Sequence, residues 1–508
     1  MALATLTSRV LGMVRVMVYA NFMGDKWVAG AFTLAFSIPN LFRRLLGEGA
    51  LTAAFIPAFT EKQKTAGEAE MWRAANAVLS GLIVVAATII GLAMLVLSLV
   101  LAAHQFDAQT DLMLRLLRVM FPYMLLVCVA AVMMGMLNAR GHFFIPAMGS
   151  TMLNLVMIAS VIFLSPHMGS GKEQQIFALA IGVLVAGVAQ AAFQLPALYR
   201  DGFKWRWVSP WRDEMVRRVV RKMIPGAIGI AAFQLNVLVT TNIAFLFDPQ
   251  INASFDYAVR LMELPQGMFG ISLATFLLPA LSGLAFEKKY DEFRGTLRHG
   301  LETMLFANCI ASSLLVVLAS PIIRLLFERG EFTPGATGRA AFALICLAPG
   351  LVAFSTVNIL ARAFYALNDT RTPMRISIFC LLMNVPLSVF LVWRFKQGGL
   401  GMANSLTSVL NLFLLSHALR RKLKTLDMPL MRQRVVELVS VAAVAGAVAW
   451  VVLLGWEREV GHQTVLQKAG AVFVPAAVAG LVYLGFAFAI KVPAAREISG
   501  LLLRRVRR

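Results

Sequence analysis

Long apolar runs alternate with short polar connections along the whole chain. A helix that crosses the hydrocarbon core of a bilayer needs about 20 apolar residues, and runs of this length recur from one end of the sequence to the other. The second and eighth runs are the least hydrophobic and the richest in glycine and proline, which is typical of helices that line a wet interior. The pattern predicts an all-α, polytopic membrane protein with about fourteen transmembrane helices, over residues 3–23, 28–59, 75–104, 112–138, 143–165, 175–199, 219–247, 254–285, 298–321, 339–367, 374–394, 399–419, 435–455 and 470–490.

An internal repeat divides most of these spans into two sets. Pro122 and the stretch from Leu137 to Arg140 correspond to Pro349 and the stretch from Leu367 to Arg371. The offset is about 225–230 residues, which corresponds to six spans. Because an even number of spans preserves orientation, the sets are predicted to form two parallel six-helix lobes related by an axis along the membrane normal. The last two spans fall outside the repeat as an extra helix pair.

The repeat predicts how the chain is divided into parts. The two lobes are expected to be joined by a basic cytoplasmic linker, and the extra pair is expected to carry a basic tail. The predicted parts are the N-terminal lobe with helices 1–6 over residues 1–200, the linker over 201–222, the C-terminal lobe with helices 7–12 over 223–421, and helices 13–14 with the tail over 422–508.

The charge of the chain supports this topology. Only 14% of the residues are charged, against roughly 25% in soluble domains, and 47 lysines and arginines face 26 acidic residues, giving a formal net charge of +21. Such an excess can indicate nucleic-acid binding, but here the basic residues concentrate in alternate connections, as the positive-inside rule requires of cytoplasmic loops. We therefore expect both termini in the cytoplasm and no nucleic-acid partner.

The predicted linker combines tryptophan with arginine. Trp205, Trp207 and Trp211 interleave with basic residues, which suits an amphipathic helix lying in the membrane interface on anionic lipid headgroups. A basic cytoplasmic linker with interfacial tryptophans is the alternative. The basic residues concerned are Arg206, Arg212, Arg217 and Arg218.

Four arginines lie where the sequence predicts membrane spans. A cation in hydrocarbon costs several kcal/mol, so it is expected to face a cavity, a partner or a ligand. Arg9 and Arg15 are six residues apart, which offsets them by about 120° around a helix. Arg43 follows a proline that interrupts its span, and Arg260 occupies the matching point of the second repeat. Together they predict a substrate site for an anion, because the guanidinium fork binds phosphate in a bidentate manner.

A structural explanation of each arginine is also available. An arginine near the end of a span can extend its charge to the interface, or it can pair with an acid on the same helix. Arg44 and Glu48 have the spacing for such a pair, and so do Arg260 and Glu263.

No catalytic or metal-binding motif accompanies the arginines. The sequence has no HExxH, no aspartate-rich metal motif and no paired carboxylates at helical spacing. We therefore predict no catalytic residues, no cofactor, no metal site and no enzymatic activity. No cleavable signal peptide is evident, because the first apolar run carries arginines. The cysteines lie far apart within apolar runs and are expected to be small core residues; they are Cys128, Cys309, Cys346 and Cys380.

Several motifs together resemble those of the MurJ (MviN) family of lipid II flippases, within the multidrug/oligosaccharidyl-lipid/polysaccharide exporter superfamily. The resemblance extends over essentially the whole chain. The motifs are Ser8-Arg9-Val10-Leu11-Gly12-Met13-Val14-Arg15, Pro39-Asn40-Leu41-Phe42-Arg43-Arg44 with Glu48-Gly49-Ala50, Arg260-Leu261-Met262-Glu263-Leu264-Pro265-Gln266-Gly267, and Phe364-Tyr365-Ala366-Leu367-Asn368-Asp369-Thr370-Arg371-Thr372-Pro373.

The resemblance implies a function as well as a fold. It implies a protein of the bacterial inner membrane that moves lipid II, the undecaprenyl-pyrophosphate-linked disaccharide-pentapeptide, from the cytoplasmic to the periplasmic leaflet by alternating access. No oligomer is indicated by the sequence, so we expect a monomer. By motif position, Arg9, Arg15, Arg43 and Arg260 correspond to the arginines of the family's cavity. The alternatives are a polysaccharide-unit or drug exporter of the same superfamily and, less favoured, a membrane-embedded prenyl-phosphate enzyme.

The sequence departs from the family where relatives carry acids. Val16, Gly30, Thr240 and Ser388 stand at such positions, while Asn384 is retained. Because a hard cation needs several oxygen ligands and usually a negative charge, a sodium site built from carboxylates is not expected. We hypothesise that membrane potential acting on the cationic cavity matters more for transport than sodium.

Overall fold

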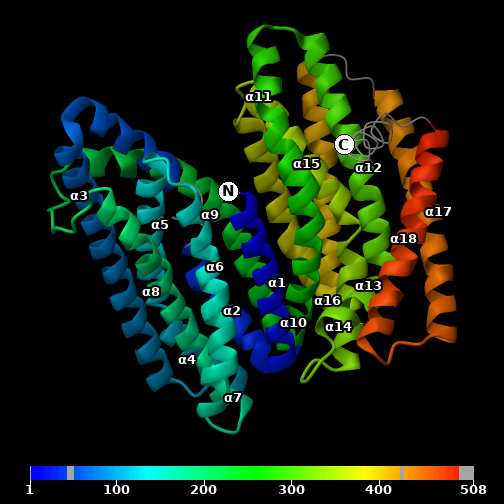
Figure 1. The fold of residues 1–508 in the computed structure, drawn as a ribbon, viewed down its shortest axis with the longest axis horizontal. Coiled ribbons are helices and arrows are strands. Elements are labelled where there is room, and N and C mark those ends of the chain that lie inside the picture. Colours follow the sequence, from blue (N-terminus) through cyan, green and yellow to red (C-terminus); the bar gives the residue numbers. More distant parts are fainter. Residues whose placement is uncertain (1, 43–50, 424–427, 491–508) are drawn as a thin grey trace. The chain divides into compact units, whose positions relative to one another are not determined.

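The computed structural model describes residues 2–42, 51–423 and 428–490 (Figure 1). These residues form helices joined by short connections, with no β-strand among them, which confirms the predicted all-α class. The chain forms two compact units: unit 1 is Met1–Ala253 with Arg329–Glu331, and unit 2 is Ser254–Glu328 with Phe332–Arg508. The predicted limits of the two lobes stay predictions.

Helices make up almost all of both units. Unit 1 contains α1 (Ala2–Met23), α2 (Trp27–Phe42), α3 (Leu51–Ala103), α4 (Ala108–Met120), α5 (Tyr123–Ala139), α6 (Phe144–Ala159), η2 (Ser160–Leu164), η3 (Ser165–His167), α7 (Lys172–Gln175), α8 (Phe177–Arg200) and α9 (Glu214–Phe247). The chain continues through α10 (Pro249–Pro265) into η4 (Gln266–Ile271), α11 (Ser272–Phe286), α12 (Tyr290–Val317), α13 (Ala319–Phe327), α14 (Pro334–Leu347), α15 (Gly350–Ala366), α16 (Arg371–Leu423), α17 (Met428–Glu459) and α18 (Val465–Ala489).

Many of the helices are long and apolar enough to cross a membrane. Within the described ranges, 8 helices meet this condition, or up to 10 if each bent pair counts as one span. The predicted count of about fourteen stays a prediction, while the polytopic character is confirmed.

Two prolines bend corresponding spans of the repeat. The axis turns by 41° between α4 and α5, at Pro122, and by 45° between α14 and α15, at Pro349. Proline lacks an N–H group and its ring clashes with the preceding turn, so a helix bends where it occurs. The two prolines that the sequence repeat aligns therefore produce the same local geometry in each half of the repeat.

Helix α16 is a folded-back pair rather than one rod. A straight helix of 53 residues would be about 80 Å long, nearly twice the thickness of a bilayer. Lys396 interrupts the helix with φ 49° and ψ −128°. The two arms then run alongside each other, since the side chain of Asn384 donates a hydrogen bond to Thr407 Oγ1 at 3.0 Å. Both spans predicted over 374–394 and 399–419 thus lie in α16.

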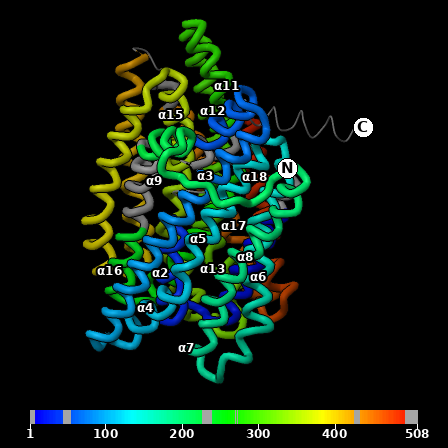
Figure 2. The backbone as a smooth tube through the Cα atoms, turned by 90° about the vertical axis from the view of Figure 1, so that its left-hand side faces the viewer, coloured from blue at the N-terminus to red at the C-terminus, as the bar shows by residue number. Residues whose placement is uncertain are grey.

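The core of unit 1 consists of two clusters that share α5 and α8, one with α2 and α4 and the other with α3 and α9. Helix α5 lies beside both α3 and α8 (Figures 1 and 2). Small residues allow these helices to approach closely, as is common in membranes. A Cβ added to Gly187 of α8 would lie 2.8 Å from Leu126 Cβ and 2.9 Å from the ring of Tyr123, and both of these residues belong to α5. Gly187 therefore fixes the contact between α8 and α5.

Candidate anion-binding site

Helix α1 carries the first two candidate arginines and is held against α6. The side chain of Asn154 on α6 donates a hydrogen bond to the carbonyl oxygen of Ser8 at 3.0 Å, and Asn154 is only 5% exposed. One turn along, a Cβ added to Gly12 would lie 3.7 Å from the same amide nitrogen. The serine and glycine of the first motif therefore form the contact with α6, and this contact sets the rotation of α1 about its axis.

Arg15 lies on an aromatic support. Its guanidinium carbon lies 5.6 Å from the centre of the Tyr19 ring, a cation–π contact worth about 0.5–2 kcal/mol. Tyr19 packs edge-on against Phe32 of α2, with ring centres 6.0 Å apart, and Phe32 stacks on Phe36 at the same distance. Arg15 is partly buried, whereas Arg9 is exposed. Arg15 is therefore the more strongly positioned of the two cations.

Arg260 is paired with two acids on its own helix, α10. Its guanidinium lies 3.2 Å from Glu263 Oε2 and 3.3 Å from Asp256 Oδ1, and its side chain is 32% exposed. The pair with Glu263 is the structural alternative that the spacing suggested. The sequence analysis did not predict the pair with Asp256, although residues at i, i+4 lie next to each other on a helix and oppositely charged ones commonly pair.

The two acids change what Arg260 can do. The charges of Arg260, Asp256 and Glu263 sum to −1. An anion can therefore bind Arg260 only by displacing a carboxylate from it. The carboxylates in turn can accept hydrogen bonds from hydroxyl or amide groups. The cluster of Asp256, Arg260 and Glu263 therefore suits a polar headgroup that carries both an anion and hydrogen-bond donors.

A π-helix follows this cluster directly. Pro265 ends α10, and η4 has the widened π geometry before α11 resumes. Gly270 in η4 packs against Ser355 of α15, where an added Cβ would lie 2.7 Å from the hydroxyl oxygen. Single-turn π-helices occur frequently at functional sites, so the irregularity next to Arg260 marks this segment as a functional candidate.

The convergence of all four arginines stays a prediction. Arg43 and the Arg44–Glu48 pair lie outside the described residues, while Pro39 before them is buried in α2. Arg9 and Arg15 belong to unit 1 and Arg260 belongs to unit 2.

A neutral polar cluster occupies the facing arms of α16. The side chain of Asn384 donates to Thr407 Oγ1 at 3.0 Å and to Asn404 Oδ1 at 3.3 Å, and Ser388 Oγ donates to Asn384 Oδ1 at 3.4 Å. Asn384 and Ser388 are 3% and 0% exposed. In the described part of the chain, no group of three or more His, Cys, Asp or Glu side chains is arranged to hold a metal ion.

The fourth motif has a structural role. Asn368, two residues after the end of α15, has a φ of 57°, a left-handed conformation that asparagine tolerates better than most residues. Asp369 then caps α16 by accepting a hydrogen bond from the Thr372 N–H at 3.0 Å. Lys422 donates to the same carboxylate at 2.6 Å, and these contacts lower the pKa of Asp369 to about 2. The motif therefore shapes the connection between α15 and α16.

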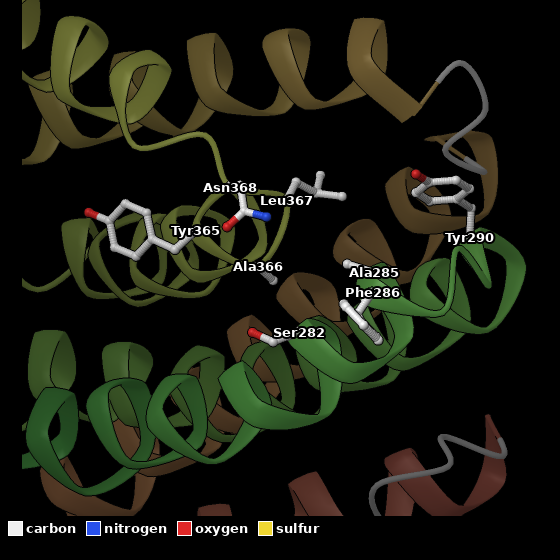
Figure 3. Close-up of a pocket in the computed structure, with 8 residues that line it drawn as sticks. All are labelled: Ser282, Ala285, Phe286, Tyr290, Tyr365, Ala366, Leu367 and Asn368. Carbon is white, nitrogen blue, oxygen red and sulfur yellow. The ribbon is translucent and has the colours of Figure 1, made fainter.

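A cavity of about 370 Å³ lies beside this connection in unit 2 (Figure 3). Ser282 of α11 and Asn368 lie on opposite sides of it, and aromatic rings complete the lining. The lining residues are Ser282, Ala285, Phe286, Tyr290, Tyr365, Ala366, Leu367 and Asn368. Among the described candidate arginines, none of Arg9, Arg15 and Arg260 lines this cavity.

Known proteins resemble the chain in both sequence and structure. Residues 19–467 match the family model described as lipid II flippase MurJ. The chain is 34% identical over 468 residues to a probable lipid II flippase MurJ of Vibrio cholerae, covering 90% of this chain and 87% of that relative. It is 32% identical over 456 residues to a lipid II flippase MurJ of Burkholderia cenocepacia, covering 88% of each.

Solved structures share the fold. A structure of lipid II flippase MurJ in an inward closed conformation aligns with a TM-score of 0.78 at 21% identity, covering 100% of this chain and 99% of the other. An inward-facing multidrug resistance transporter of the MATE family aligns with a TM-score of 0.69 at 14% identity, covering 83% of this chain and 96% of the other. At these identities the structural matches establish the fold alone.

Proposed function

The chain belongs to the MurJ family of lipid II flippases, and we propose from this membership that it moves lipid II from the cytoplasmic to the periplasmic leaflet of the bacterial inner membrane. It works by alternating access and catalyses no chemical reaction. The observation that supports the proposal is a cation within an apolar helix, since the guanidinium of Arg15 lies over the Tyr19 ring in α1. The protein acts as a monomer with both termini in the cytoplasm and has no nucleic-acid partner.

The arginines bind the pyrophosphate of the substrate. A pyrophosphate group presents several oxygens, and a guanidinium fork can bind two of them at once. Arg9, Arg15 and Arg43 contact this group, while Arg260 exchanges a carboxylate for it and leaves Asp256 and Glu263 to accept donors from the sugar and peptide. The prenyl tail stays in the lipid or lies along a hydrophobic groove.

The bent spans provide places where the helices can move. Pro122 and Pro349 bend α4–α5 and α14–α15 by 41° and 45°, and η4 interrupts the span that contains Arg260. Helices that already have an interrupted hydrogen-bond ladder can change angle at small cost. We infer that these three points absorb the motion that exposes the headgroup first to one side and then to the other.

Transport is expected to depend on membrane potential and not on sodium. The Asn384 cluster consists of neutral groups that satisfy one another, and moving one charge through 100 mV is worth about 2.3 kcal/mol. In proteoliposomes, replacing sodium with potassium at fixed potential should leave the flipping rate unchanged, whereas collapsing the potential should lower it severalfold.

A matched variant makes the sodium experiment sharper. Ser388→Asp introduces an acid where relatives carry one, beside the oxygen atoms of Asn384 and Thr407. This variant should gain sodium dependence. Strict dependence of the original chain on sodium, with no response to potential, would contradict the proposed energy source.

Complementation tests the function itself. Cells depleted of their own lipid II flippase should grow when this chain is expressed, and proteoliposomes containing it should move lipid II between leaflets. A chain that exports a drug or a polysaccharide unit, or that cleaves prenyl phosphate, would fail both assays. Failure with confirmed expression in the membrane would therefore refute the proposal.

A further inference from the structure

The segment that connects α8 to α9, residues 201–213, has no regular secondary structure for most of its length. After the turn that ends α8, residues 203–210 have no regular secondary structure, and α9 begins at Glu214. The helix predicted for the tryptophan-rich linker is therefore absent from residues 203–210, and the helical part begins only after Trp211. What gives this segment a fixed shape is its contact with α3.

Two buried polar side chains of α3 hold the backbone of the linker. Asn76 donates to the carbonyl oxygen of Lys204 at 3.0 Å and accepts from the N–H of Arg206 at 3.3 Å. Ser80, one turn further, accepts from the N–H of Val208 at 3.3 Å. Asn76 and Ser80 are 3% and 0% exposed, so their hydrogen bonds to the linker are shielded from water.

Apolar contacts fix the two ends of the same segment. The ring of Phe203 packs edge-on against Trp72 of α3, with ring centres 5.6 Å apart, and Phe203 is 1% exposed. At the other end Pro210 lies so close to α3 that a Cβ added to Gly81 would come within 3.0 Å of it. The linker is thus attached along α3 from Trp72 to Gly81.

This attachment leaves the tryptophans facing outward. Trp205, Trp207 and Trp211 are 43%, 60% and 68% exposed, although Phe203 in the same segment is buried. Tryptophan side chains are enriched where one part of the ring meets hydrocarbon and the indole N–H meets polar headgroups. Three such rings on one fixed backbone form an exposed aromatic surface.

Basic side chains lie next to the exposed tryptophans along this segment. Lys204, Arg206 and Arg212 are exposed, and among the described residues they form no ion pair. The two acids of the segment are occupied elsewhere, since Asp201 lies 3.1 Å from His142 Nε2 and Asp213 accepts from the N–H groups of Met215 and Val216 at the start of α9. The surface therefore carries net positive charge that is available to an anion.

The position of the attachment along α3 matches the depth of lipid headgroups. The outward-facing apolar stretch of α3 begins at Val85, which is 52% exposed, and continues to Val100. Ser80 precedes Val85 by about 7.5 Å along the helix axis and Asn76 precedes it by about 13.5 Å. Headgroup regions extend about 5–8 Å beyond the hydrocarbon core, so the linker crosses α3 at and just beyond the edge of that core.

We propose that residues 204–212 form a binding surface for the headgroups of anionic phospholipids, on the side of the membrane that the charge pattern assigns to the cytoplasm. The phosphate of a bilayer lipid lies against Lys204, Arg206 and Arg212, and the tryptophan rings lie at the boundary between headgroup and hydrocarbon. Asn76 and Ser80 hold this surface in place. The inference concerns the membrane around the protein and does not depend on which substrate is transported.

Lipid binding to the purified full-length chain tests the proposal. In neutral detergent, phosphatidylglycerol titrated into the protein should bind more tightly than phosphatidylcholine, as measured by native mass spectrometry. Since each basic residue near an anionic surface contributes about 1 kcal/mol, the triple variant Lys204→Gln, Arg206→Gln, Arg212→Gln should bind phosphatidylglycerol at least tenfold more weakly. The matched control Arg375→Gln, Arg420→Gln, Arg421→Gln removes the same charge from exposed positions of α16 and should weaken binding by less than threefold.

Fluorescence tests the role of the tryptophans and of the attachment. In vesicles with brominated acyl chains, quenching of tryptophan fluorescence should increase as phosphatidylglycerol replaces phosphatidylcholine. This increase should disappear when Trp205, Trp207 and Trp211 are changed to Phe. Trp393→Phe, which removes a 73% exposed tryptophan of α16, should leave the rise intact. Asn76→Ala with Ser80→Ala should abolish it while every cation and tryptophan is retained.

Two results would overturn the proposal. One is equal phosphatidylglycerol binding by the linker variant and the control variant. The other is quenching by the linker tryptophans that does not respond to anionic lipid, which would indicate that the surface faces water or an acidic protein.

Discussion

Arg15→Ala is expected to abolish complementation and to lower the flipping rate in proteoliposomes by at least 30-fold. Removing one partner of a desolvated charge contact costs about 2–5 kcal/mol, which corresponds to about 30-fold or more. Arg15 meets this condition because it is partly buried and held over Tyr19 within a chain of packed aromatic rings. Arg15→Lys keeps the charge without the fork and should retain part of the activity.

Arg115 provides the matched control for this substitution. It lies in α4, its side chain is 57% exposed and it pairs with Asp111 at 2.6 Å, an exposed pair of a kind that contributes little to stability. Arg115→Ala should therefore leave flipping within twofold of the original rate. Equal losses in Arg15→Ala and Arg115→Ala would contradict a specific role for Arg15.

Arg260→Ala requires a different design, because it leaves two carboxylates of α10 without their cation. Such a variant can fail to fold for that reason alone. The triple variant Arg260→Ala, Asp256→Asn, Glu263→Gln removes the uncompensated charge, and it should be expressed normally yet remain inactive. Recovery of transport in the triple variant would show that Arg260 only neutralises its acids.

The fold could be predicted further than the site. Runs of about 20 apolar residues specify helices without knowledge of their partners, so the sequence predicts the all-α class and the spans on both sides of Lys396. The matching bends at Pro122 and Pro349 were also visible as a repeat, because the effect of proline on a helix is local.

Contacts between distant segments could not be predicted in this way. The pairing of Arg260 with Asp256 could have been predicted from their i, i+4 spacing. The support of Arg15 by Tyr19 and Phe32, in contrast, depends on how α1 packs on α2. The linker shows the same limit. Its alternation of tryptophan and arginine suggested an amphipathic helix, whereas residues 203–210 are not helical and their backbone is bound by Asn76 and Ser80, more than 120 residues earlier. Because Asn76 and Ser80 bond to backbone N–H and C=O groups of the linker, these groups do not need the hydrogen bonds of a helix.

Gly30, which stands where the family resemblance predicts an acid, is explained by packing. Gly30 lies buried in α2, where an added Cβ would be 2.2 Å from the carbonyl oxygen of Pro249 and 2.8 Å from its carbonyl carbon. Both contacts are with backbone at the start of α10, and proline cannot relieve them by rotating about φ. The absence of a side chain at residue 30 is thus a requirement of this packing.

Gly30→Asp, which restores the acid that relatives carry, is therefore expected to be among the most damaging single substitutions in unit 1. Overpacking a close contact costs about 1–3 kcal/mol or more, and the buried carboxylate adds a desolvation cost. We expect Gly30→Ala to lower the unfolding temperature in detergent by several degrees and Gly30→Asp to prevent accumulation of folded protein. Gly91→Ala is the control, because a Cβ at Gly91 of α3 meets nothing within 4 Å and alanine favours the helix by about 1 kcal/mol. If Gly30→Ala were as stable as Gly91→Ala, the close contact between α2 and Pro249 would not exist in the folded protein.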